Sequence, residues 1–99
     1  MSFFQDFISA IFGGNEYSSR QHFVAEEDIK RLVSQGKTPS LSQGEERLIE
    51  QAIAARRRDG KISLLQVDEV LRKLEHAHRI SEVDRQGVMH VFKEYLGSR

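Results

Sequence analysis

The chain has 99 residues, of which 38% are hydrophobic and 30% are charged, and its formal net charge is zero. This length suffices for one small domain with a single core, and the balanced charge lacks the basic excess of most DNA-binding domains. Because the chain has no cysteine, disulfides, thiolate metal sites and cysteine nucleophiles are excluded.

Residues 1–14 predict an amphipathic helix. Ser2 and Gln5 have the spacing of a capping box, and Gly13-Gly14 end the pattern. Large apolar residues recur on one face at helical spacing; they are Phe3, Phe4, Phe7, Ile8, Ile11 and Phe12. The polar residues that follow predict a loop or linker, after which a helical domain occupies residues 22–99 of a protein that is a single domain overall.

Residues 25–35 predict the second helix. Acidic side chains fill its first turn, where the helix dipole favours negative charge, and Gly36 ends it. Its apolar face consists of Ile29, Leu32 and Val33.

Two further helices open with a capping box, in which a Ser is followed three residues later by Glu or Gln. Ser42 pairs with Glu45 in one, and Ser63 pairs with Gln66 in the other. Apolar residues recur at helical spacing in both. They are Leu48, Ile49, Ala52 and Ile53 in the first helix, and Val67, Val70, Leu71 and Leu74 in the second.

The last helix is predicted to begin after Ser81, with Asp84 as a weaker capping partner. Gly87 lies inside it at a cost of roughly 1 kcal/mol relative to alanine; close contact with another helix is one explanation and simple tolerance is another. No segment alternates long enough for a strand, and residues 61–63 offer at most a minimal β-bridge. The expected fold class is all-α, a compact irregular bundle of four to five short helices.

The junction at Asp59-Gly60, with Ile62 and the helix after it, resembles the second half of an EF-hand. The resemblance implies a loop with Gly60 at its sixth position. The residues at the first, third and twelfth positions lack the carboxylates that calcium requires; they are Ala55, Arg57 and Gln66. We therefore expect no calcium binding, whether the segment is an EF-hand-like fold without metal or an ordinary turn between helices.

The remaining sequence predicts neither a metal site nor a catalytic site. His76 and His78 are two residues apart and so point to different sides of a helix. The sequence contains no Gly-x-Ser-x-Gly, no phosphate-binding Gly-rich loop and no His-Glu-x-x-His. We expect a non-enzymatic protein without metal or cofactor.

The densest group of cations consists of Arg56, Arg57, Arg58 and Lys61. One interpretation is a solvated helix end, because cations favour the negative end of the helix dipole. The other is contact with nucleic-acid phosphates, although the zero net charge provides little drive from counterion release. A small nucleic-acid-binding regulator is therefore the alternative function, and nucleic acid is not the leading partner.

The apolar face of residues 1–14 is the most informative feature. Burying its six large side chains contributes on the order of 10 kcal/mol gross, at roughly 2 kcal/mol for each. Such a face packs on the other helices, docks into a partner or a second copy of the chain, or lies on a membrane surface. The membrane is disfavoured because residues 1–14 carry Asp6 and no Lys or Arg, so anionic lipid does not attract them. We predict a protein-protein interaction or regulatory module that binds through Phe3, Phe4, Phe7, Ile8, Ile11 and Phe12.

The cellular location is inferred from what the sequence lacks. No apolar run reaches the length of a transmembrane segment. The first residues also lack the positively charged start and the cleavage site of a secretory signal, and they carry Asp6 instead. We expect a cytoplasmic protein.

Overall fold

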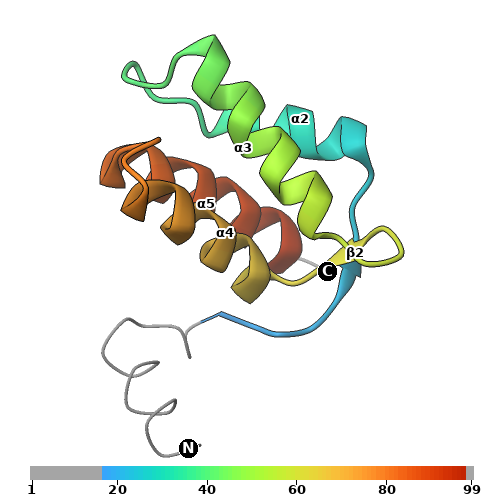
Figure 1. The fold of residues 1–99 in the computed structure, drawn as a ribbon. Coiled ribbons are helices and arrows are strands. Elements are labelled where there is room, and N and C mark those ends of the chain that lie inside the picture. Colours follow the sequence, from blue (N-terminus) through green and yellow to red (C-terminus); the bar gives the residue numbers. More distant parts are fainter. Residues whose placement is uncertain (1–16, 98–99) are drawn as a thin grey trace, which may run out of the picture.

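The computed structural model describes residues 17–97, which form four helices and two short strands in the order β1–α2–α3–β2–α4–α5 (Figure 1). The bounds are β1 His22–Phe23, α2 Glu26–Gln35, α3 Gln43–Arg56, β2 Lys61–Ile62, α4 Leu64–His76 and α5 Glu82–Gly97. The predicted all-α class is confirmed, with one small sheet added. The helix predicted for residues 1–14 lies outside the described residues.

The four described helices surround one core. α2 packs against α3 and α5, and α4 packs against the same two helices, so each helix has two helical neighbours. Figure 1 shows α4 and α5 side by side, with α3 leading into the hairpin that carries β2. None of the described helices is long and apolar enough to cross a membrane.

The core is built from the predicted apolar faces. Within the described residues, sixteen hydrophobic side chains are buried. The helices contribute Ile29, Leu32, Val33, Ile49, Ile53, Leu64, Val67, Leu71, Val88, Met89, Phe92 and Leu96. Strand β2 contributes Ile62, and the connections contribute Val24, Leu41 and Ile80. Leu48 and Ala52 are only partly buried, so the buried face of α3 is narrower than predicted.

Two of the three predicted capping boxes are confirmed, and the third, Ser2 with Gln5, lies outside the described residues. The Ser42 hydroxyl accepts from the Glu45 N–H at 3.2 Å, and Glu45 Oε1 accepts from the Ser42 N–H at 2.8 Å. Ser63 and Gln66 make the same reciprocal pair. Each box satisfies two backbone donors that a helix start leaves without a partner inside the helix.

Gly87 is required by close packing. A Cβ atom on Gly87 would lie 2.7 Å from the Gly36 carbonyl oxygen, and one on Gly36 would lie 2.8 Å from the Gly87 carbonyl oxygen. The backbones of α5 and of the end of α2 therefore touch. Gly36 has φ −85°, so it does not adopt the positive φ of a left-handed helix cap. Glycine is required at this position because of the contact with Gly87.

The two strands pair residues that are far apart in the sequence. β1 runs antiparallel to β2, with His22 opposite Ile62 and Phe23 opposite Lys61. The segment before β1 is also held in place, because the Ser18 carbonyl accepts from the Leu65 N–H at 3.1 Å. Two-residue strands carry no periodic signal, which is why the sequence did not predict β1.

Candidate functional site

Asp59 and Gly60 form the tip of a tight hairpin. Both have positive φ, 55° and 76°. Arg58 and Lys61 on either side exchange backbone hydrogen bonds of 2.9 and 3.0 Å. Asp-Gly is typical of such two-residue hairpins, since both residues adopt the left-handed region at low cost. The segment that resembles an EF-hand loop thus closes immediately into a hairpin, in place of a twelve-residue ligand loop.

Arg57, one of the four predicted cations, points inward. Its Nη1 donates to the Val24 carbonyl at 2.8 Å and its Nε donates to the Ala54 carbonyl at 3.2 Å. Its Nη2 also lies 3.6 Å from a carboxylate oxygen of Glu26, and only 17% of the side chain is exposed. Arg57 therefore ties the connection between β1 and α2 to the end of α3, which corrects its predicted placement beside the other cations.

The other three predicted cations surround one hollow. Arg56, Arg58 and Lys61 line a depression of about 430 Å³. Gln21, Asp59 and Gln66 complete its lining. Arg56 faces Glu69 at 4.0 Å on the surface, a contact that water screens strongly. Within residues 17–97, neither the Arg58 guanidinium nor the Lys61 ammonium makes an ion pair.

Phe23 lies beside these cations, and the sequence did not predict it as a site residue. It is 61% exposed. Phe23 and Lys61 are opposite each other across the strands, and Lys61 is opposite Arg58 across the hairpin. Opposite residues of an antiparallel pair project from the same face. We call the surface of Phe23, Arg58 and Lys61 the hairpin face.

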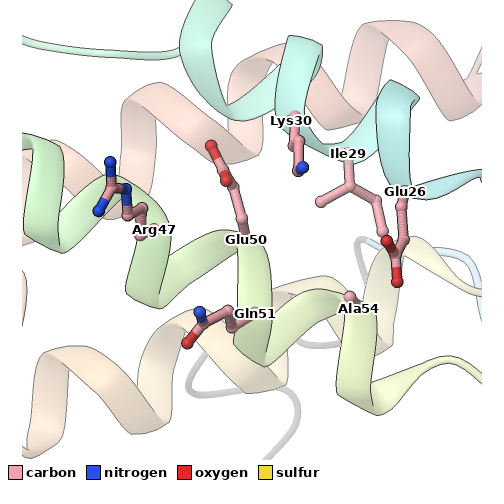
Figure 2. A pocket seen from close by; sticks show the side chains of 7 residues that line it. All are labelled: Glu26, Ile29, Lys30, Arg47, Glu50, Gln51 and Ala54. Atoms are coloured by element: carbon pink, nitrogen blue, oxygen red, sulfur yellow. The ribbon is translucent and has the colours of Figure 1, made fainter.

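A second recess lies between α2 and α3 and measures about 330 Å³. Figure 2 shows Ile29 and Lys30 projecting from α2, and Glu50 pointing from α3 toward α2. The lining residues are Glu26, Ile29, Lys30, Arg47, Glu50, Gln51 and Ala54. These residues include no hydroxyl and no imidazole group. The polar groups of the recess are carboxylates, cations and one side-chain amide, which can form ion pairs and hydrogen bonds with a ligand.

Glu50 is the perturbed group of the α2–α3 recess. Burial raises the pKa of its carboxyl, and the negative charge of Glu46 raises it further, against the opposing effect of Lys30 and Arg47. A raised pKa in a recess is a feature of many functional sites and also of structural ion networks. Here burial is the largest cause of the raised pKa, and both neighbouring cations oppose it.

Asp84 binds two segments together. Its Oδ2 accepts from the Ser81 N–H at 3.1 Å, which completes the predicted cap of α5. Its Oδ1 accepts from the Thr38 and Ser40 hydroxyls at 2.5 and 2.6 Å. Burial by itself would raise the pKa of this carboxyl, but the hydrogen bonds from Ser40, Thr38 and Ser81 hold it below its ordinary value.

A buried ion network joins α4 to α5. Asp68 is 2% exposed and Arg85 is 8% exposed. Arg85 Nε lies 2.5 Å from Glu75 Oε1, and Arg85 Nη1 lies 3.9 Å from Asp68 Oδ1. Arg72 Nε reaches the other Asp68 oxygen at 2.9 Å. Such a network fixes how two helices meet, because each buried charge requires its partner.

The remaining site predictions concern metals and residues 1–14. In residues 17–97, no three or more of the His, Asp and Glu side chains are grouped so that they could hold a metal ion. The predicted partner-binding residues lie outside the described part of the chain; they are Phe3, Phe4, Phe7, Ile8, Ile11 and Phe12.

Comparison with known proteins yields no relative: no protein family, no curated protein and no solved structure matches this chain.

Proposed function

We propose that this chain is a non-enzymatic, cytoplasmic protein-interaction module. Its partner is another protein or a second copy of the chain. The partner covers the apolar face of residues 1–14, which consists of Phe3, Phe4, Phe7, Ile8, Ile11 and Phe12. The free energy comes from removing these side chains from water.

The supporting observation is the core formed by the rest of the chain. Sixteen hydrophobic residues between Val24 and Leu96 are buried. Among the described large hydrophobic residues, Phe23 and Val83 stand out as exposed. The sequence of residues 1–14 holds six large apolar side chains at helical spacing, and a contiguous apolar face that is exposed typically marks an interaction site.

The test is the double substitution F7D/I11D, which places two charges on the apolar face. We expect the variant to lose self-association, measured by light scattering over a concentration series. If the partner is another protein, we expect the monomer to lose binding of an apolar fluorescent dye. The melting temperature should change little, because the core of residues 24–96 is untouched.

Phe92→Ala is the matched control. Phe92 is fully buried, and its truncation should cost about 3–5 kcal/mol of folding free energy. If F7D/I11D destabilises the chain as strongly as Phe92→Ala, the face of residues 1–14 belongs to the core, and the proposal is wrong.

A second candidate function is nucleic-acid binding. The observation that favours it is the hollow lined by Arg56, Arg58 and Lys61. Arg57 is not part of this candidate site, because it donates to the Val24 carbonyl. Oligonucleotide binding at low salt that is lost in R58Q/K61Q would support this function, and no binding would exclude it.

A further inference from the structure

The hairpin face combines an exposed aromatic ring with cations. Phe23 rests against the hairpin tip, since a Cβ atom on Gly60 would lie 2.6 Å from its ring carbon Cε2. The ring is thus supported by backbone while 61% of the residue remains exposed. The opposite face of the sheet is turned inward, because Ile62 is fully buried.

We propose that the hairpin face binds single-stranded nucleic acid, with a base stacked on Phe23 and flanking phosphates bound by Arg58 and Lys61. This rests on the second candidate function and gives it a class of ligand. Aromatic side chains next to cations are the common elements of single-strand binding, because every base offers a π-face and every nucleotide a phosphate.

The charges at the site favour an anionic ligand. Arg58 and Lys61 have no ion-pair partner within residues 17–97, and Arg56 lines the same hollow. Asp59 is an exposed anion at the hairpin tip and opposes phosphate binding. The excess of positive charge at the hairpin face is therefore small. It suits a short stretch of nucleic-acid backbone with few phosphates.

A single strand fits better than a duplex for two reasons. The bases of a duplex are stacked on one another and present no free face to Phe23, whereas unpaired bases do. The chain also has zero net charge, so it lacks the sequence-independent attraction that drives non-specific duplex binding. Stacking on the ring then has to supply part of the affinity.

The test measures binding of the full chain to a fluorescently labelled octanucleotide of thymidine, by anisotropy at low salt. Phe23→Leu keeps an apolar side chain but removes the π-face, and we expect it to lower the association constant at least about fivefold. Arg58→Gln should weaken binding and lower the slope of log affinity against log salt by about 0.7.

Asp59→Asn provides a gain-of-function test. Asn tolerates positive φ as well as Asp does, so the hairpin is retained while the opposing charge is removed. We expect binding to become about two- to fivefold tighter. Lys93→Gln, on the exposed side of α5, is the control for a general charge effect and should leave the affinity unchanged.

Three results would overturn the inference. The first is no binding of the octanucleotide at low salt. The second is equal affinity for a duplex of the same length, unaffected by Phe23→Leu. The third is equally tight binding of an octaglutamate peptide, which would indicate a site for acidic protein segments.

The same titration separates this inference from the interaction proposed for residues 1–14. F7D/I11D should bind the octanucleotide as tightly as the unaltered chain does, and Phe23→Leu should leave the mass in solution unchanged. Circular dichroism confirms that each variant folds.

Discussion

At the scale of single residues, several side chains have two tasks that the sequence shows only in part. Asp84 was predicted as a cap of α5, yet it also accepts hydrogen bonds from Thr38 and Ser40. Arg57 was predicted as a surface cation, yet it binds the Val24 carbonyl. In both cases the predicted role follows from neighbouring residues in the sequence. The additional hydrogen bond is made to a residue far away in the sequence.

The hydrogen bonds of Asp84 make folding stability depend on pH. Its pKa is lowered in the folded chain, from about 3.9 in an unfolded one. The carboxylate therefore stabilises the fold above the unfolded pKa, and this contribution is lost as the pH falls through the folded pKa. We expect urea unfolding to show stability falling as the pH is lowered from about 5.

Asp84→Asn isolates this contribution. The amide is uncharged, so it accepts weaker hydrogen bonds than the carboxylate does, and we expect a loss of about 1–3 kcal/mol at pH 7. The variant should also show less loss of stability below pH 4 than the unaltered chain. Glu94→Gln, on an exposed residue, is the control; an equal loss of stability there would contradict the assignment.

At the scale of elements, the helix boundaries follow from capping residues that are close together in the sequence. The contacts between helices do not follow from such local interactions. Ser42 and Ser63 cap α3 and α4 as predicted, because each box needs only residues within one turn. The touching backbones at Gly36 and Gly87 depend on how α2 meets α5. The sequence offered that contact only as one of two explanations for Gly87.

Two glycine substitutions distinguish backbone contact from helix propensity. Gly87→Ala gains about 1 kcal/mol of propensity but forces a Cβ atom against the Gly36 carbonyl, so we expect a net loss of about 1–3 kcal/mol. Gly44→Ala is the matched control, since a Cβ there meets only the Ser42 hydroxyl, at 4.0 Å. It should stabilise α3, as followed by thermal unfolding; a stabilising Gly87→Ala would disprove the contact.

At the scale of the whole molecule, contacts between segments far apart in the sequence hold the described helices and strands together. Each described helix packs against two others, the strands join β1 to β2, and Asp84 joins the loop at Thr38 to α5. No described helix is a separate unit, because all four line the same core.

Because the four described helices share one core, we expect them to unfold cooperatively. Tyr17 and Tyr95 both pack against the core from different segments. We expect far-ultraviolet circular dichroism, which reports the helices, and tyrosine fluorescence to give one coincident thermal transition. Separate transitions would show that part of the described chain unfolds by itself.

The candidate site was predicted only in part. Arg56, Arg58 and Lys61 lie within six residues of one another, so their grouping around one hollow could be predicted from the sequence. Phe23 was not, because its position beside Lys61 depends on the register of β1 and β2. A single exposed phenylalanine gives no local signal that distinguishes it from a core residue.

The sequence by itself determined the all-α class, the capped starts of α3, α4 and α5 and most of the apolar faces. These features arise from interactions within one or two helical turns, where spacing along the chain equals proximity in space. Only the tertiary structure decided the β1–β2 pairing, the inward turn of Arg57 and the second partners of Asp84. Each of these joins segments far apart in the sequence, and the packing of the shared core sets their distance.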